Sequence, residues 1–388
     1  MLPLLLGTAL AAPPVADHPC ELPSPDDPVQ VYLVTVTPGW DAISSLGHTL
    51  VLVAGGGHDP ALTYNWGAYD TSSDTVVQDF VRGELPYFLA TWVWPAQREA
   101  LLEQGRAALA QKLDLDDPEG FVGALEEAAK PENNRYVYDW RTANCATKAR
   151  DFLDDQLDGT LASQWSVPAD TTAREQIRRH LGRATAQDLG WSFVASSEVN
   201  EPLSEWEAAL FPDQLMASVA DTTVNGEPLV SETCLLLPGR FGWAPERPPP
   251  TWPWLVPGGL FGWLAVSGAQ GLRGENQRSG RWLLGGSLLA YGAFLAFLGT
   301  TTLALALGTS MRAAGPTPAW LLASPHSLVF VAAAVPVLRG RPIPRWLALG
   351  GVLSAALAVV GLLVAPPGIG LALAPGTLAC AWAMWRAQ

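Results

Sequence analysis

The most constraining feature of this chain is a change near residue 250, where acidic residues end and long apolar segments begin. Of its 37 acidic residues, only Glu275 lies beyond position 251. The first 251 residues hold 15 basic and 36 acidic residues, a net charge of −21, and the remainder holds eight basic and one acidic, a net charge of +7. We therefore predict an acidic soluble domain over residues 13–251 and a membrane domain over 252–388. So acidic a first domain should not bind nucleic acid.

Five apolar segments of spanning length follow the run Pro248-Pro249-Pro250. They cover roughly residues 253–271, 282–308, 319–338, 346–365 and 368–385. If the acidic domain is exported, the first segment runs from outside to inside. Five spans then place seven of the eight basic residues on the cytoplasmic side, with Arg312 as the exception. This is the distribution that the positive-inside rule predicts, and an even number of spans would break it.

Residues 1–12 read as a short apolar core ending in small residues, which is typical of a signal peptide. Export would place the acidic domain in an oxidising compartment outside the cytoplasm. The expected strands there lie near 29–37, 48–53 and 63–66, and a helix is expected at about 96–112. A second helix over 171–181 should turn Arg174, Arg178 and Arg179 outward.

Cys145 is the candidate nucleophile. From Cys145 onward, apolar and small residues recur at every third or fourth position, so a helix should begin there. The start of a helix favours an anion, which would stabilise a thiolate. Asn144 could cap this helix and could also direct its amide at a developing oxyanion. Without a partner base, Cys145 would be an ordinary buried residue at a helix end.

His48 is the best candidate for that base. It heads an apolar run that ends in Gly55-Gly56-Gly57, as a buried strand closed by a turn would. A neighbouring strand should supply a polar group that orients the imidazole, and we expect Asn65, with Tyr64 as the alternative. Only one of these two can face the site, because side chains alternate along a strand.

Several motifs around these residues resemble the periplasmic domain of Lnb-type lipoprotein N-acyltransferases over about residues 28–235. They are Val31-Tyr-Leu-Val-Thr-Val-Thr-Pro-Gly39, Leu46-Gly-His48-Thr, Tyr64-Asn-Trp-Gly-Ala-Tyr-Asp70, Phe80-Val-Arg-Gly83 and Asn144-Cys145-Ala-Thr-Lys-Ala-Arg-Asp151. The resemblance implies an α+β fold of the permuted NlpC or papain-like thiol-enzyme type, with the histidine before the cysteine. The family usually has threonine or serine after its cysteine, where this chain has Ala146.

The resemblance also implies acyl transfer to the N-terminal amine of diacylglyceryl-cysteine lipoproteins. We expect the acyl chain to come from a phospholipid through an S-acyl enzyme, at the periplasmic surface of the inner membrane of a bacterium. The alternatives are a periplasmic thiol amidase, peptidase or lipid hydrolase of the NlpC type, and a non-catalytic membrane scaffold. The sequence contains no metal-ligand spacing and no phosphate- or dinucleotide-binding glycine motif, so we expect no metal and no cofactor.

The other cysteines and one intramembrane histidine leave two questions open. With Cys145 assigned to chemistry and Cys380 in an apolar segment, Cys20 and Cys234 either pair in the oxidising periplasm or stay as two thiols. His326 falls within the third apolar segment. It is either functional or simply hydrogen-bonded inside the helix bundle, and we favour the second reading.

Overall fold

The computed structural model describes residues 18–41, 44–70, 72, 74–182, 185–310, 317–365 and 368–388. The expected signal peptide at residues 1–12 and Arg312 lie outside these ranges. The chain forms two compact units. An α/β unit comprises the described residues up to Leu181 together with Asn200–Pro248, and a helical unit comprises Gly182–Val199 and Pro249–Gln388. The segment Gly182–Val199 thus groups with the helical unit, although it precedes the expected boundary at residue 251.

The α/β unit is built on a seven-stranded antiparallel sheet. In spatial order its strands are β11 (Val230–Leu237), β5 (Ala108–Leu113), β1 (Gln30–Val36), β2 (His48–Gly55), β3 (His58–Tyr69), β4 (Pro86–Val93) and β6 (Arg135–Val137). The three strands expected from sequence correspond to β1, β2 and β3. Gly55, Gly56 and Gly57 connect β2 to β3 with positive φ angles, which glycine adopts without steric penalty.

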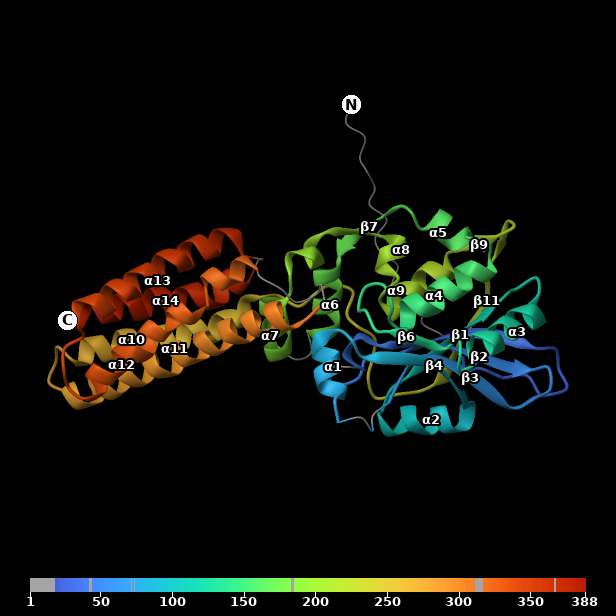
Figure 1. The fold of residues 1–388 in the computed structure, drawn as a ribbon, viewed down its shortest axis with the longest axis horizontal. Coiled ribbons are helices and arrows are strands. Elements are labelled where there is room, and N and C mark those ends of the chain that lie inside the picture. Colours follow the sequence, from blue (N-terminus) through green and yellow to red (C-terminus); the bar gives the residue numbers. More distant parts are fainter. Residues whose placement is uncertain are drawn as a thin grey trace, which may run out of the picture. The chain divides into compact units, whose positions relative to one another are not determined.

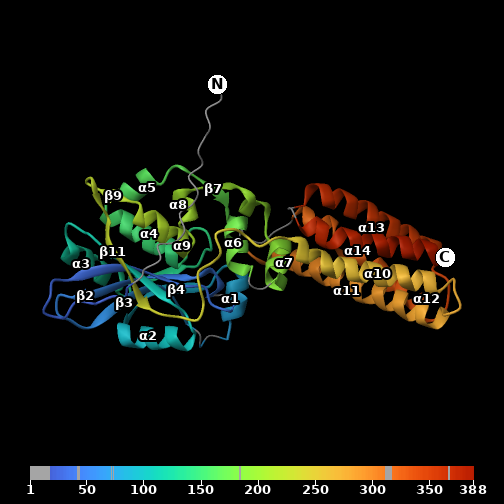
Figure 2. The same ribbon diagram turned by 180° about the vertical axis from the view of Figure 1, so that it is seen from behind.

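Helices cover both faces of this sheet (Figures 1 and 2). α2 (Trp94–Glu103) lies on one face, and α4 (Cys145–Gln156) and α9 (Pro212–Ala220) lie on the other. Successive side chains of β1 pack into two separate hydrophobic cores, one on each face of the sheet. Val31 and Leu33 belong to one core, and Tyr32 and Val34 belong to the other. Because both faces are buried, β1 and β2 are continuously apolar rather than alternating.

The helix expected over 96–112 is wrong in its second half. Helix α2 ends at Glu103, and Gly105 with a φ of +69° turns the chain. Residues Ala108–Leu113 form β5, which pairs with β1 on one side and with β11 on the other. Leu109 and Leu113 fit a helical period, but pairing with two distant strands decides their conformation.

The outward direction expected for the arginines of the next helix is also wrong. In α6 (Ala173–Leu181), Arg174 and Arg179 are buried. The Nη2 of Arg179 donates to Asp213 Oδ2 at 3.1 Å, and His180 Nε2 lies 3.3 Å from Asp213 Oδ1. The buried carboxylate of Asp213 on α9 therefore explains why Arg179 and His180 point inward. Arg174 instead donates from its Nε to Asn200 Oδ1 at 2.5 Å.

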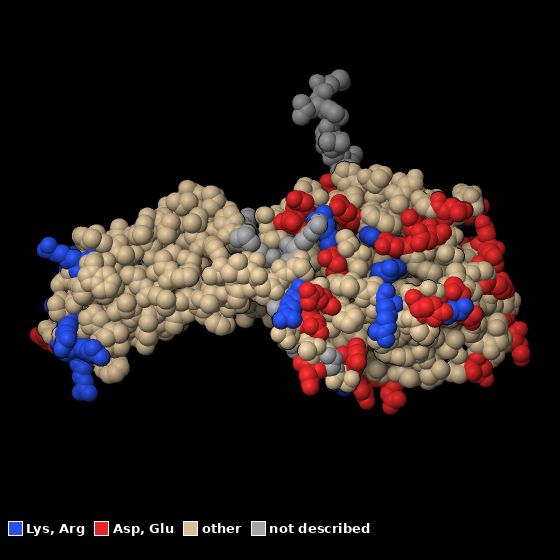
Figure 3. Space-filling model, in the orientation of Figure 1, with Lys and Arg blue, Asp and Glu red and all other residues tan. Residues whose placement is uncertain are grey.

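The remaining elements of the α/β unit are short. They are α1 (Val76–Arg82), α3 (Pro118–Ala128), α5 (Thr160–Gln164), α8 (Glu205–Ala208), β7 (Pro168–Thr172), β8 (Pro202–Ser204), β9 (Thr223–Val224) and β10 (Glu227–Pro228). Acidic side chains are spread over the surface of this unit (Figure 3).

The helical unit contains α7 (Thr185–Val194), α10 (Leu255–Gly271), α11 (Gln277–Gly308), α12 (Leu328–Leu338), α13 (Arg345–Val364) and α14 (Ile369–Arg386). Among the described residues, three helical segments are long and apolar enough to cross a membrane, namely Gln277–Gly308, Pro318–Leu338 and Arg345–Val364. The other two expected spans are helical as α10 and α14, and the count of five stays a prediction. Gly258 and Gly268 of α10 let α14 and α11 approach closely, because a Cβ there would lie 2.1 Å from Ala372 O and 2.3 Å from Leu284 N.

On the face seen in Figure 3, the basic side chains of the helical unit gather at one end. Arg273 Nη2 donates to the carbonyl of Arg386 at 2.9 Å, and a Cβ on Gly340 would lie 2.6 Å from Arg281 Nη1. The α10–α11 loop, the α12–α13 loop and the C-terminus therefore meet at the same end.

A disulfide joins Cys20 to Cys234 of β11, across 214 residues of sequence. The peptide N–H of Cys20 also donates to Leu235 O at 3.0 Å, so the first described residues are held against the sheet edge. A cross-link that closes a long loop restricts the unfolded chain and thereby stabilises the folded one.

We expect the double variant Cys20→Ser/Cys234→Ser to lose about 2–5 kcal/mol of unfolding free energy, the typical loss for removal of a native disulfide. Thermal unfolding of the full chain in detergent, with and without reductant, measures this. Reductant should lower the melting temperature of the wild type and leave that of the variant unchanged. Equal melting temperatures for the two oxidised proteins would contradict the prediction.

Candidate active site

Cys145 is the first residue of α4, as the sequence predicts, and Asn144 is the capping residue. Asn144 Oδ1 accepts from the N–H groups of Ala146 and Thr147 at 2.8 and 2.9 Å, and Thr147 Oγ1 accepts from Asn144 N at 2.8 Å. This reciprocal capping satisfies N–H groups that a helix start otherwise leaves unpaired. Cys145 as a whole residue is partly exposed at this position.

The amide nitrogen of Asn144 is already occupied. Its Nδ2 donates to Trp140 O at 2.8 Å and to Leu210 O at 3.0 Å. A side-chain amide has two N–H groups, so both are used. The structure therefore supports the capping role of Asn144 and leaves it no N–H group for an oxyanion.

His48, at the start of β2, is hydrogen-bonded to Cys145 and to Asn65. Its Nε2 lies 2.8 Å from Asn65 Oδ1, which also accepts from the N–H of Gly67 at 2.7 Å. Because Gly67 donates, this atom must be the amide oxygen, and His48 Nε2 must then carry the proton. The other ring nitrogen, Nδ1, is left to accept the proton of the Cys145 thiol.

An irregularity in β3 brings Asn65 to the imidazole. The pairing of β3 with β4 shifts between Asn65 and Ala68, as at a β-bulge. Such bulges re-aim side chains near the ends of paired segments. Tyr64, the alternative partner from the sequence, is buried in the core that contains Val51 and Leu153 instead. Burial raises the pKa of Tyr64 to about 12, with a smaller contribution from Glu126, so the phenol is neutral.

The surroundings of Cys145 favour its thiolate. Burial raises the pKa of the thiol, but this effect is outweighed by the charge and hydrogen bond of His48, by the N–H of Thr49 and by the charge of Arg106, so that the pKa is lowered. A thiolate is the nucleophilic form of cysteine. The same groups would stabilise a thiolate as it leaves a covalent intermediate.

Three tyrosines form a wall beside the sulfur. Tyr87 of β4, Tyr136 and Tyr138 each interact electrostatically with Cys145. The rings of Tyr87 and Tyr138 stack with centroids 4.9 Å apart. Burial raises the pKa of each of the three tyrosines, so all three phenols are neutral.

Sequence reasoning missed Tyr87 and Arg106. No local pattern in the sequence marks Tyr87 or Arg106 as part of the site. They reach the site through the pairing of β4 with β6 and of β5 with β1.

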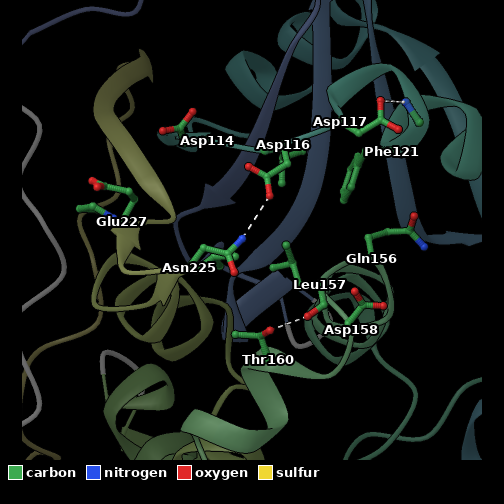
Figure 4. A pocket seen from close by; sticks show the side chains of 14 residues that line it. Asp114, Asp116, Asp117, Phe121, Gln156, Leu157, Asp158, Thr160, Asn225 and Glu227 are labelled. Atoms are coloured by element: carbon green, nitrogen blue, oxygen red, sulfur yellow. Dashed lines mark hydrogen bonds between the residues drawn. The ribbon is translucent and has the colours of Figure 1, made fainter.

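The larger of two pockets described in the α/β unit lies away from this site. It has a volume of about 690 Å³ and is lined by acidic residues such as Asp114, Asp116 and Asp158 (Figure 4). None of its lining residues interacts with Cys145 or His48 in the hydrogen bonds described above. Within the described ranges, no group of three or more histidine, cysteine or acidic residues could hold a metal ion.

These features define a class of protein: a mixed α/β domain with a cysteine, a histidine and an asparagine in one hydrogen-bonded series, followed by apolar helices suited to a membrane. Residues 25–176 match the Lnb N-terminal periplasmic domain. This part of the chain therefore belongs to the family of Lnb N-terminal periplasmic domains, and Cys145, His48 and Asn65 all lie within it. No curated protein and no solved structure matches the chain.

The hydrogen bond from His48 to Asn65 can be tested directly. We expect Asn65→Leu to slow the alkylation of Cys145 by iodoacetamide at pH 7 about tenfold, because the imidazole loses the partner that holds its tautomer. Peptide mass spectrometry of timed samples gives the rate at Cys145 alone. Tyr64→Phe, which keeps the buried ring, should react like the wild type. If Tyr64→Phe slows alkylation and Asn65→Leu does not, the assignment of the orienting residue is wrong.

Gly67 provides a steric test of the same arrangement. A Cβ at Gly67 would lie 2.4 Å from His48 Cε1, closer than two carbon atoms can approach. Gly67→Ala should therefore displace the imidazole and lower the alkylation rate by about 100-fold, as small misplacements in active sites can. Gly123→Ala is the matched control, because a Cβ there meets no atom within 4 Å. An unchanged rate in Gly67→Ala would show that the imidazole does not occupy this position when Cys145 reacts.

Proposed function

We propose that this protein is a lipoprotein N-acyltransferase that moves an acyl chain from a phospholipid to the N-terminal amine of a diacylglyceryl-cysteine lipoprotein. The observation that carries the proposal is the series Cys145, His48 and Asn65 at the start of α4, where the thiol pKa is lowered. Membership of the Lnb-type family supports a role in lipoprotein modification. The helical unit supports action on substrates that reside in a membrane.

In the first step, His48 takes the proton of Cys145, and the thiolate attacks the carbonyl carbon of a phospholipid ester. A C–S bond forms, and the ester C–O bond breaks as the tetrahedral intermediate collapses. The imidazolium returns its proton to the departing alkoxide, which leaves as a lysophospholipid. The enzyme is left as an S-acyl thioester on Cys145.

In the second step, the amine of the lipoprotein attacks the thioester carbonyl. His48 accepts the proton of the amine, a C–N bond forms and the C–S bond breaks. The products are an N-acylated lipoprotein and the original pair of Cys145 and His48. The same residue therefore acts as base and acid in turn, which requires an imidazole held in one tautomer at the start of each step.

The membrane anchor suits this chemistry. Donor and acceptor are both lipids, so a catalytic domain tethered to their bilayer meets them at a high effective concentration. The wall of Tyr87, Tyr136 and Tyr138 supplies apolar surface beside the sulfur. Excluding water from the thioester favours attack by the amine over hydrolysis.

The proposed topology has five spans in the inner membrane, with the α/β unit in the periplasm. The gathering of Arg273, Arg281 and the C-terminal Arg386 at one end of the helical unit supports a cytoplasmic location for that end. The α10 and α14 helices would complete the five spans.

A complementation experiment tests the proposed function. In a cell depleted of its own apolipoprotein N-acyltransferase, the wild-type chain should restore growth and convert the free N-termini of lipoproteins into amide-linked acyl groups. Mass spectrometry of N-terminal lipopeptides measures the conversion. Cys145→Ala, Cys145→Ser and His48→Ala should each fail, because alanine cannot attack and a serine hydroxyl is not ionised by this environment.

Other products would point to other activities. Unchanged diacyl lipopeptides together with cleaved wall peptides or free fatty acid would replace the transferase with a hydrolase. If the products are the same with the wild type and with Cys145→Ala, the protein has no thiol-dependent activity in this cell, and the interpretation as a non-catalytic membrane scaffold would replace the transferase. A lipopeptide of unchanged total mass, with one chain moved from the glyceryl ester to the amine, would keep the acyl transfer but place the donor ester on the lipoprotein itself.

A further inference from the structure

Arg106 is a buried guanidinium that is only partly paired. It is 5% exposed, and it precedes β5 in the chain. Its Nε donates to Thr37 O at 2.7 Å, and its Nη1 lies 3.5 Å from Gln104 Oε1, the limit of a hydrogen bond. Its Nη2 is buried and has no hydrogen-bond partner among the residues that the structure describes. A buried charge with an unpaired donor destabilises a protein unless a nearby anion compensates it.

Strand pairing places Arg106 at the end of the sheet where His48 lies. Val36, the last residue of β1, is opposite His48 on β2 and opposite Ala108 on β5. Thr37, which holds the guanidinium, directly follows Val36. Arg106, just before β5, and His48, the first residue of β2, thus lie on the two sides of the same end of β1, and both interact electrostatically with Cys145.

We propose that Arg106 is the permanent cation of this site: its guanidinium, held by Thr37 with Nη2 unpaired, stabilises the sulfur of Cys145 as a thiolate. Arg106 is a positioning residue in this role, because it acts through Cys145 rather than on the substrate. The inference rests on Cys145 being the nucleophile of the proposed function.

The division of labour between Arg106 and His48 follows from their charges. His48 gains and loses a proton in each step, so its positive charge is transient. Arg106 is charged throughout, because burial lowers its pKa only to about 10. A constant positive charge favours the thiolate both when it attacks an ester and when it leaves the thioester.

The other titratable groups near the sulfur and the guanidinium do not supply this charge. The phenols of Tyr87, Tyr136 and Tyr138 are neutral because burial raises their pKa. Asp41 interacts electrostatically with Arg106, and its carboxylate accepts hydrogen bonds from Ser44 N, at 2.9 Å, and from Ser44 Oγ. Arg106 therefore interacts with one exposed carboxylate and with the reactive sulfur.

The pH dependence of Cys145 alkylation tests the proposal. Iodoacetamide reacts with thiolate, so the rate rises with pH through the thiol pKa. Arg106→Gln keeps N–H donors but removes the charge, and it should shift the profile upward by about one pH unit, the lower end of what an opposite charge produces. Below both pKa values the rate then falls about tenfold. Arg106→Lys keeps the charge and should leave the profile near that of the wild type.

A purely structural role predicts a different pattern. If the profiles of Arg106→Gln and Arg106→Lys shift equally, or if that of Arg106→Gln does not shift, the proposal is wrong. If Arg106→Gln does not fold, Arg106→Lys alone tests the proposal. An upward shift of about one pH unit in the alkylation profile of Arg106→Lys would overturn it, because that variant keeps the positive charge. Arg179→Gln is the control for loss of a buried arginine, since the Nη2 of Arg179 is paired with Asp213 at 3.1 Å. Its profile should stay in place.

The readout separates this proposal from the function it rests on. Alkylation is followed at Cys145 by peptide mass spectrometry of the full chain in detergent, so the second free thiol, Cys380, does not contribute. No acyl donor or acceptor is needed. A protein that shows the expected shift but transfers no acyl chain would keep the role of Arg106 and refute the transferase. A wild-type protein that transfers acyl chains, with no shift in the profile of Arg106→Gln, would support the transferase and refute the role of Arg106.

Discussion

Four hydrogen bonds from the side chain of Asn144 hold the start of α4, and the position of Cys145 depends on them. The amide oxygen accepts from Ala146 and Thr147, and the amide nitrogen donates to Trp140 and Leu210. These bonds saturate the amide and connect the helix to the segment before it and to the chain before α9. Packing of α4 against β2 and β3 then sets Cys145 at the sheet end that carries His48. A nucleophile on a rigid helix start keeps its geometry better than one on a loop.

The other members of the site come from places where the sheet departs from regularity. Asn65 reaches His48 where the register of β3 shifts, and Gly67 leaves room for the imidazole because it has no Cβ. Arg106 follows Gly105, whose positive φ separates α2 from β5. The register shift of β3 brings Asn65 to His48, and the turn at Gly105 precedes Arg106 at the same end of the sheet. Local irregularity of this kind is common around active sites.

The two units have different surfaces because one is suited to water and the other to lipid. The α/β unit is acidic on its surface and places its apolar residues in two cores, one on each face of the sheet. The helical unit exposes large apolar side chains such as Trp263, Leu307 and Leu363, and it packs its helices through small residues. Exposed apolar area and close glycine contacts are expected of helices surrounded by lipid. The family match ends at residue 176, so the case for a membrane unit rests on these helices themselves.

The sequence by itself determined the features that depend on neighbours in the chain. The change near residue 250, the strands β1, β2 and β3, and a helix that starts at Cys145 all follow from composition, periodicity and capping. It also singled out Cys145, His48 and Asn65 as candidates.

Only the tertiary structure decided the features that depend on distant segments. β5 is a strand because β1 and β11 pair with it on both sides, although its leucines also fit a helix. Arg179 and His180 of α6 point inward because Asp213 is buried on α9. Arg106 and Tyr87 join the site only through strand pairing. Hydrogen bonds between strands and charges inside a core join residues far apart in the chain, and no local pattern encodes which of them will meet.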